Sequence, residues 1–443
     1  MIVIAAGRPV FRQSNQNYDR RKTIMTPENQ KRYDEKVKRL EDAVTLKEPD
    51  RVPITPSAGM YAAFHSGYTM AEIVYDTTLE KTTKAMKKYL TDFDPDSGTD
   101  FGTMGAGEGP ILEKIKTKNM LYPGMPGANI DDNSLQQFIE YPLLLDDEFE
   151  EFFSDRTGWS MKKASPRTSE LLEPLANIEF GFSGGNARFL AQAFSRPDVR
   201  AMIEDFWAIN DFYKEHQVRV ERMRQEILDL GFPLMGAMGG GLVPFDAYSD
   251  FLRGTILTME DFFERPEYIE KFIDQAIEET EARILATKGK DEGKHAFVAL
   301  HKGMDGFMSP ELYRKYYWPH LQRIILAIIE SGKVPYIYTE GKYDTRIDCL
   351  TEVPPGKVFY HFEDVDMAVV KKKLGGIACI SGGFPAALLD WGTPEMVRDE
   401  AKRLLDICAP GGGFIFETSC GLGKCKQENV EAMFETVKEF GVY

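Results

Sequence analysis

Short apolar runs alternate with amphipathic segments throughout the second half of the chain. In each amphipathic segment the apolar residues recur every three or four positions, the period of a helix with one buried face. An apolar run followed by such a helix is the building unit of a parallel sheet covered by helices. The repeat therefore predicts strands at 296–300, 336–339, 358–360, 377–381 and 414–416, followed by helices at 309–331, 344–351, 366–374, 393–408 and 427–440.

Weaker strand patterns occur earlier, near Val52, Phe182 and Leu234. They bring the total to about eight strands, the number in a TIM (β/α)8 barrel, which needs roughly 250 residues. Because no linker-like stretch interrupts the repeat, we expect an α/β fold with one decorated barrel domain over residues 26–443. A doubly wound open sheet is the alternative. The additional length lies in N-terminal helices and in a glycine- and proline-rich middle, about 97–161, which is typical of lid loops.

Composition narrows the class of partner. The formal net charge is −16 and the pI is near 5.1, which argues against a nucleic-acid surface and against docking on an anionic membrane. The five cysteines form no closely spaced disulfide framework, so we expect reduced thiols in the cytoplasm. No apolar run reaches the ~18 residues that a membrane span requires. Residues 1–25, rich in arginine, are expected to be a flexible leader.

Metal-binding residue types follow three of the predicted strands. Glu340 comes after 336–339, His361 after 358–360, and Cys420 shortly after 414–416. In a barrel the carboxyl ends of the strands meet on one face, so these side chains would share one mouth. Oxygen, nitrogen and sulfur donors suit tetrahedral zinc, and three protein ligands leave a fourth position open for catalysis. Each residue also has an ordinary interpretation, as a solvated acid, a structural histidine or an inert thiol.

A second polar cluster follows the strand at 296–300. His301 and Asp305 lie there, placed to orient a substrate or to shuttle a proton. The alternative is a loop that only leads into the next helix. Tyr338, two residues before Glu340, is expected to donate a hydrogen bond in the site or to pack there.

Several short motifs carry a likeness to a known family: Asp50-Arg51-Val52-Pro53, Phe251-Leu252-Arg253-Gly254, Met308-Ser309-Pro310-Glu311, Gly382-Gly383-Phe384-Pro385, Gly392-Thr393-Pro394-Glu395, Gly411-Gly412-Gly413-Phe414-Ile415 and Glu428-Asn429-Val430-Glu431-Ala432-Met433. The chain resembles the uroporphyrinogen decarboxylase superfamily and, within it, the corrinoid-dependent methyltransferase branch. The likeness covers nearly everything after Met25, and the family fold is a β/α barrel.

The resemblance implies a zinc enzyme with a departure from the pattern. Relatives that methylate coenzyme M carry His-x-Cys-Gly where this chain has Tyr338-Thr339-Glu340-Gly341, and their second cysteine matches Cys420. An oxygen donor in place of a thiolate makes zinc harder and more Lewis-acidic, which suits an ether oxygen. The chain is therefore most similar to O-demethylase methyltransferases, which move a methyl group from a methoxylated aromatic to the cob(I)alamin of a separate corrinoid protein.

The resemblance also suggests contacts with the aromatic ring, which we assign to Tyr61, Phe101, Met104, Phe182 and Tyr338. Other methyl donors on the same fold, a coenzyme M-type thiol acceptor, and a non-catalytic barrel that only docks the corrinoid protein remain alternatives. A true uroporphyrinogen decarboxylase is disfavoured because the segment Ile54–Met60 contains no arginine. The oligomeric state stays open, with a homodimer among the options.

Overall fold

The computed structural model describes residues 25–98, 105–179, 187–235, 237–290 and 293–443. The predicted leader up to residue 24 and the predicted ring contacts Phe101, Met104 and Phe182 lie outside these residues. Within the described part, no helix combines the length and apolar character needed to cross a bilayer.

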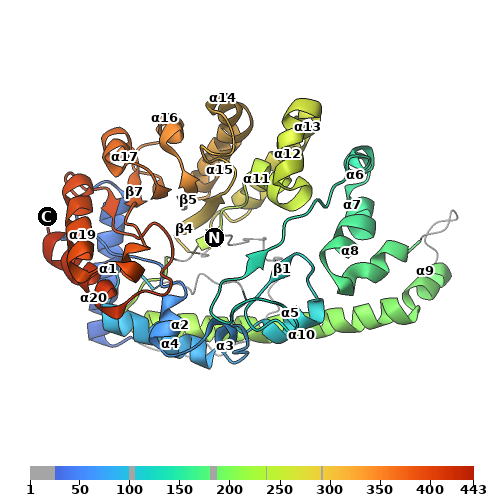
Figure 1. Ribbon diagram of the computed structural model, residues 1–443, viewed down its shortest axis with the longest axis horizontal. Helices are drawn as coiled ribbons and strands as arrows, with labels where there is room; N and C mark the ends of the chain where they lie inside the picture. Colours follow the sequence, from blue (N-terminus) through green and yellow to red (C-terminus); the bar gives the residue numbers. More distant parts are fainter. Residues whose placement is uncertain (1–24, 99–104, 180–186, 236, 291–292) are drawn as a thin grey trace.

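A six-stranded parallel sheet forms the centre of the fold (Figure 1). Its strands follow one another in chain order, and consecutive strands are usually neighbours in space. The order is β3-β4-β5-β6-β7-β8, and every neighbouring pair is parallel. The bounds are β3 Ala237–Gly239, β4 His295–Leu300, β5 Val334–Lys342, β6 Phe359–Asp364, β7 Cys379–Gly382 and β8 Phe414–Ile415. The five strand runs expected after residue 290 are therefore confirmed, with shifted ends.

Two further segments join the sheet at its edges. Beside β8, Phe416 N–H donates to Pro53 O at 2.8 Å and Thr55 N–H donates to Phe416 O at 3.0 Å. Asp96 N–H then donates to Ile54 O at 2.8 Å. Gly98 forms a parallel bridge with Leu234, just ahead of β3. Backbone hydrogen bonds thus run from β8 through residues 53–55 and 96–98 to residue 234. The segment at 96–98, which the sequence analysis did not identify, makes the link to Leu234, whereas the strand expected near Phe182 lies outside the described residues.

Helices cover the strands from outside (Figure 1). Helices α11 to α17 lie along the top of this view, α19 and α20 on the left, and α2, α4 and α10 along the bottom. Their apolar faces form a single main core with the strands. The bounds of this set are α1 Pro27–Val44, α2 Tyr61–His65, α3 Met70–Val74, α4 Glu80–Phe93, α11 Pro244–Tyr248, η3 Ser249–Arg253, α12 Thr255–Glu264, α13 Pro266–Leu285, α14 Pro310–Leu312, η4 Tyr313–Tyr317, α15 Trp318–Glu330, η5 Asp344–Arg346, α16 Ile347–Leu350, α17 Met367–Leu374, α18 Leu388–Trp391, α19 Pro394–Cys408 and α20 Gln427–Phe440.

The helix expected over 309–331 is divided by one π-helical turn, η4. Wider turns of this kind re-aim the side chains that follow them. Here Tyr313, Tyr316 and Tyr317 become buried, and Tyr317 turns its hydroxyl toward Asp246. The irregularity therefore contributes to the strand-end region described below.

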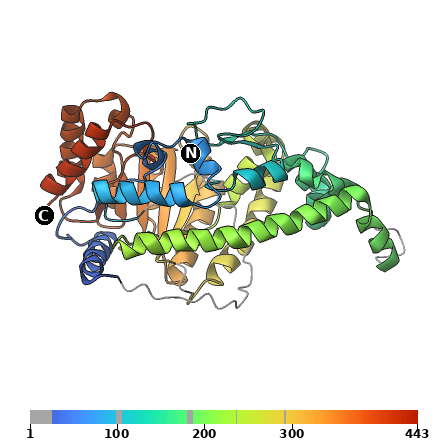
Figure 2. The same cartoon turned by 90° about the horizontal axis from the view of Figure 1, so that it is seen from below.

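The glycine- and proline-rich middle forms an arm rather than a bare loop. It contains α5 Gly109–Ile115, the antiparallel pair β1 Met120–Leu121 and β2 Gln137–Phe138, then α6 Phe149–Ser154, α7 Arg156–Trp159, η1 Ser160–Ala164, α8 Ser165–Thr168, η2 Glu170–Asn177 and α9 Ala187–Phe194. Helix α10, Pro197–Asp229, has 33 residues and so spans about 50 Å at 1.5 Å per residue. Figure 2 shows it running beside α4 with α9 at its far end.

Candidate active site at the ends of the strands

His301 stands directly after β4, where the parallel pairing with β5 ends. Its backbone N–H and that of Lys302 donate to the two carboxylate oxygens of Asp246, at 3.1 and 2.9 Å. The ring Nδ1–H donates to Asp250 at 2.5 Å. Asp246 and Asp250 are four residues apart across α11 and η3, so both face the same side of that helical stretch. One helical face thus fixes both the backbone and the ring of His301.

Charge accumulates around the His301 ring. Burial alone would lower the pKa of His301, but the hydrogen bond to Asp250 and the negative charges of Asp246, Asp250 and Glu340 raise it to about 9. The ring is therefore an imidazolium at neutral pH, with a hydrogen on both nitrogens. Lys302 adds a second positive charge, with its Nζ 3.4 Å from Asp250 and 2.9 Å from the Thr255 hydroxyl.

The second ring nitrogen of His301 is the unusual feature of this cluster. His301 is only 8% exposed, and among the described residues its Nε2 is buried with no hydrogen-bond partner. A buried donor without an acceptor costs about 1–3 kcal/mol. A positively charged donor in this state is suited to an acceptor oxygen that arrives with a substrate.

Glu340 lies on the neighbouring strand. Strand β5 was expected to end before Glu340. Instead it continues to Lys342, with an irregular register after Thr339. Burial raises the pKa of Glu340 to about 7, against the opposing positive charge of His301. The next residue, Gly341, has φ +78° and donates its N–H to Glu363 at 2.8 Å. Glu340 and His301 therefore form part of one electrostatic group, as the shared strand-end face predicted.

His361 lies inside β6 rather than after it, opposite Tyr338 of β5. The Tyr338 and His361 rings stack at 4.1 Å with an interplanar angle of 9°. The imidazole Nδ1 is 2.7 Å from Glu417, and Nε2 is 3.1 Å from the Ser419 carbonyl oxygen. Both ring nitrogens are thus engaged with protein oxygens. The strand was expected to end too early because a polar residue occupies an inward position between two apolar ones.

Glu417 is a site residue that the sequence analysis passed over. It is 6% exposed and directly follows the β8 region. Besides His361, three hydroxyl groups donate to its carboxylate: Thr55 at 2.8 Å, Tyr336 at 3.1 Å and Ser381 at 2.6 Å. Burial would raise the pKa of Glu417, but the hydrogen bonds from His361, Ser381 and Thr55 lower it. The signal that could have found it was an acid inside an otherwise apolar strand run.

The predicted zinc ligands do not converge. Within the described ranges, no group of three His, Cys, Asp or Glu side chains gathers closely enough to hold a metal ion. His361, as placed, has no ring nitrogen left for a metal. Cys420 is half-buried, and burial raises its thiol pKa. As placed, Glu340, His361 and Cys420 therefore form no three-residue group in the described structure, and zinc binding by them stays a prediction.

The other predicted site residues lie in three separate places. Tyr338 stays near the strand ends, where its hydroxyl donates to the Ser419 carbonyl at 3.1 Å. Asp305 accepts from the Thr345 hydroxyl at 2.7 Å and lies 3.4 Å from Arg346, so it fastens the loop after β5. Tyr61 is 3% exposed and packs its ring among aromatic side chains of α2 and α4.

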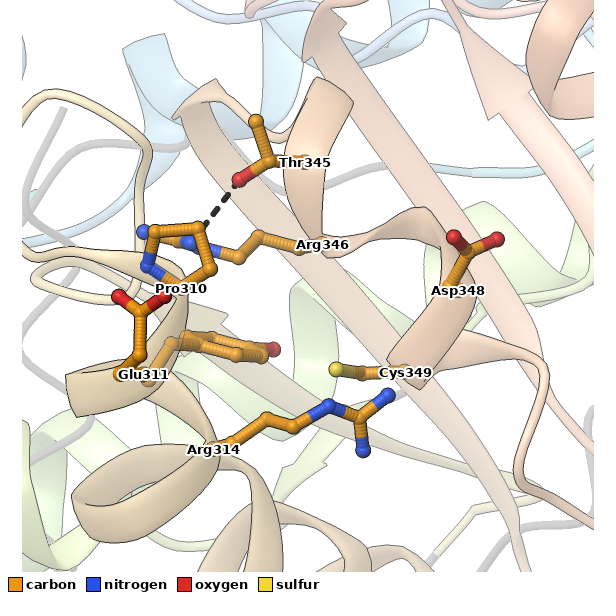
Figure 3. A pocket seen from close by; sticks show the side chains of 8 residues that line it. Pro310, Glu311, Arg314, Thr345, Arg346, Asp348 and Cys349 are labelled. Carbon is orange, nitrogen blue, oxygen red and sulfur yellow. Dashed lines mark hydrogen bonds between the residues drawn. The ribbon is translucent and has the colours of Figure 1, made fainter.

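A surface cavity of about 290 Å³ lies beside Pro310 and Glu311, which follow the loop that carries His301, and Figure 3 shows the side chains that line it. Its walls are Pro310, Glu311, Tyr313, Arg314, Thr345, Arg346, Asp348 and Cys349. The Arg346 guanidinium crosses from this cavity to the loop and donates to the Gly303 carbonyl at 3.0 Å and to the Met308 carbonyl at 2.5 Å. The cavity thus marks the support of the site and does not contain His301.

Comparison with known proteins places this arrangement in a family. The family model described as uroporphyrinogen decarboxylase (URO-D) matches residues 183–440, which include the strand-end cluster. The chain belongs to the uroporphyrinogen decarboxylase family. Family relatives include the uroporphyrinogen decarboxylase of Neisseria meningitidis serogroup C / serotype 2a, 23% identical over 227 residues that cover 48% of this chain and 61% of the relative. That of Azoarcus sp. (strain BH72) is 24% identical over 268 residues, which cover 56% and 70%.

The chain spans less than two thirds of the Neisseria relative, so the family name by itself assigns no activity here. Among solved structures, a methyltransferase from Methanosarcina mazei superposes with a TM-score of 0.56 at 15% identity, covering 91% of this chain and 98% of that one. This likeness shows the fold, an α/β architecture.

Proposed function

We propose that this protein is a methyltransferase that moves the methyl group of a phenyl methyl ether to the cob(I)alamin of a separate corrinoid protein. The observation that carries the proposal is the buried imidazolium of His301, whose Nε2 has no partner among the described residues. Cleavage of an aryl ether leaves a phenolate, and a fixed cationic donor at the developing oxyanion is the group that this step needs.

We infer that the sheet closes into an eight-stranded β/α barrel. Residues 53–55 and 96–98 supply the two strands missing from the six-stranded sheet, since their hydrogen bonds connect β8 with residue 234. In a barrel the active site lies at the carboxyl ends of the strands. Closure would place His301, Glu340 and Tyr338 around a single opening that a planar substrate enters.

In the proposed reaction, the cobalt(I) of the co-substrate attacks the methyl carbon in line with the carbon–oxygen bond. The cobalt electron pair forms the new cobalt–carbon bond, and the electrons of the broken bond remain on the aryl oxygen. The His301 Nε2–H donates to this oxygen and transfers its proton, so the product leaves as a phenol. Proton donation by a positioned side chain contributes typically 10²–10⁴-fold to rate. Solvent restores the proton to the imidazole after each turnover.

The arginines support this function over decarboxylation of a tetrapyrrole, whose several carboxylates require cationic partners. Arg51 is bound to Asp96, Arg253 to Asp261, and Arg346 to backbone carbonyls. Two of these side chains are almost completely buried: Arg253 is 0% exposed and Arg346 is 1% exposed. These guanidinium groups serve the fold, which favours a substrate with few negative charges.

Zinc bound by Glu340, His361 and Cys420 stays a prediction, and no step of the proposed reaction depends on it. Metal analysis of the purified protein tests it. Stoichiometric zinc that is lost in both Glu340→Ala and Cys420→Ser would support the two ligands. Zinc-free protein with full methyl transfer would contradict them.

The proposed function is tested by mixing the protein with reduced corrinoid protein and a panel of methoxyarenes, and following the absorbance of methylcobalamin. We expect methylcobalamin and an equal amount of phenol from at least one ether, and a loss of about 10²–10⁴-fold in rate for His301→Gln. His320→Gln is the matched control, because His320 is also buried but lies on α15 with its Nδ1 facing the Tyr316 carbonyl. No methylcobalamin from any ether, or equal rates for His301→Gln and the wild type, would refute the proposal.

A further inference from the structure

We propose that Asp250 is a positioning residue for His301, holding the imidazole so that its Nε2–H points toward the substrate oxygen. The proposal rests on the proposed function, since it assigns a role within the same site. Neither Asp250 nor its neighbour Asp246 stands out in the sequence, and both become visible only because α11 and η3 fold over the end of β4.

The geometry of the pair supports this role. The Asp250 carboxylate is nearly buried, at 6% side-chain exposure, the same as the His301 ring. One oxygen accepts from the His301 Nδ1–H at 2.5 Å, while the other lies 3.4 Å from Lys302 Nζ. A charge-assisted bond of this length fixes both the rotation of the ring and which nitrogen is left without a partner among the described residues. With Nδ1 held by Asp250, the Nε2–H of His301 can donate a hydrogen bond in one direction only.

The support behind Asp250 is rigid. Its helical turn η3 is anchored by Arg253, which donates to Asp261 at 2.7 Å and to the Leu144 carbonyl at 2.7 Å. Asp246 is held by the Tyr317 hydroxyl at 2.7 Å, so the backbone of His301 is fixed from the other side. A carboxylate mounted on such a scaffold keeps its partner in place to the precision that catalysis requires.

Another histidine of the same sheet provides an internal contrast. His361 is buried like His301, but both of its ring nitrogens meet protein oxygens, as expected for a structural residue. His301 has one nitrogen bound to Asp250 and the other without a partner in the described structure. The difference indicates that the Asp250–His301 pair holds a donor ready for a ligand and does not merely stabilise the fold.

The charged groups that face His301 are Asp250 on η3, Asp246 on α11, Glu340 on β5 and Lys302 beside it. Asp250 contributes both a hydrogen bond and a negative charge to the raised pKa of the ring. Asparagine at 250 keeps the size and an acceptor oxygen but removes the charge. Deprotonation of His301 should then occur at lower pH, because burial opposes the charged ring.

The test compares Asp250→Asn with Asp274→Asn, the matched variant of an exposed acid 3.9 Å from His320. Methyl transfer is measured against pH, and the ring of His301 is followed by NMR of protein with labelled histidine, the signal being assigned with His301→Gln. In the wild type, activity should fall as pH rises through about 9. In Asp250→Asn the fall in activity should begin at a pH at least about one unit lower. We also expect kcat to be reduced about 10–100-fold and KM to change less than about threefold. Asp274→Asn should match the wild type.

An unchanged pH profile and an unchanged His301 titration in folded Asp250→Asn would overturn the proposal. The wild-type NMR titration is a second test that needs no variant to fold, and a His301 ring that loses its proton at or below its ordinary pKa of about 6.5 would also overturn it. The outcomes remain separable from the proposed function. If the wild type transfers no methyl group, the function fails, while the NMR titrations still report whether Asp250 controls His301.

Discussion

Removing the carboxylate of Asp96 should loosen the join between the N-terminal helix and the sheet. Asp96 is 0% exposed. It accepts from Arg39 at 2.5 Å, from Arg51 at 2.7 and 2.9 Å, and from the Ile54 N–H at 2.8 Å. Three elements thus meet on one carboxylate, at the place where residues 53–55 and 96–98 run together. Asp96→Ala leaves these donors facing an uncharged cavity.

The cost can be worked from these contacts. Removing one partner of a buried ion pair costs about 3–5 kcal/mol. Arg39 keeps Asp50, and Arg51 keeps the Val52 carbonyl, so the lower end, about 3 kcal/mol, applies. Burial would raise the pKa of Asp96, but Arg51, Arg39 and Lys36 lower it below its ordinary value of 3.8. The contribution of Asp96 is therefore complete above pH ~4 and is lost as the pH falls through the folded-state pKa.

Urea denaturation measures the global effect, and hydrogen exchange of a peptide covering Ile54 measures the local one. Asp348→Asn is the control, because the Asp348 side chain is 70% exposed and pairs with Lys373 across the surface, a contact worth about 0–1 kcal/mol. We expect Asp96→Ala to lower the unfolding free energy by about 3 kcal/mol and to speed exchange at Ile54. An effect no larger than that of Asp348→Asn would refute this reasoning.

Two further predictions concern the interior and the strand ends. Gly382→Ala should destabilise the fold by about 3 kcal/mol or more, because at φ +86° a Cβ would lie 2.0 Å from the Phe362 carbonyl oxygen. Gly411 has φ +80° and open space around it, so Gly411→Ala should cost only the ~1–2 kcal/mol of the left-handed backbone. Equal urea midpoints for the two variants would contradict this prediction. Glu417→Gln should lower the unfolding free energy by about 2–4 kcal/mol, since one neutral amide cannot accept from all the donors that meet on the carboxylate; an unchanged midpoint would show that the network contributes little.

The strand and helix order was predictable because parallel strands are buried on both faces and therefore appear as apolar runs. The ends were less predictable. Inside the sheet, polar groups replace apolar ones at alternate positions, as His361 does between Tyr360 and Phe362, which turn outward into the apolar core. When a polar residue on the inner face of a strand follows an apolar one, it looks in the sequence like the end of a buried run. The strand predicted over 358–360 was therefore too short, since β6 continues to Asp364.

The strand-end cluster was predictable only where a polar residue interrupts or ends an apolar run. His301 and Glu340 were identified in this way, although β5 continues past Glu340 to Lys342. Asp246 and Asp250 were not, because two acids four residues apart in a helical segment usually face solvent, and only the tertiary fold turns this pair inward. Glu340, His361 and Cys420 form no group of three in the described structure, because position at a strand end fixes where a side chain starts, not which partner its polar atoms meet.

The central claim is that this protein breaks an aryl methyl ether and passes the methyl group to cobalt. The most direct test supplies a methoxyarene whose methyl group carries three deuterium atoms, together with reduced corrinoid protein, and analyses the cobalamin by mass spectrometry. We expect a methylcobalamin that retains all three deuterium atoms, formed in equal amount to the phenol and about 10²–10⁴-fold more slowly by His301→Gln. Phenol without labelled methylcobalamin, or labelled methylcobalamin formed equally well by His301→Gln, would contradict it.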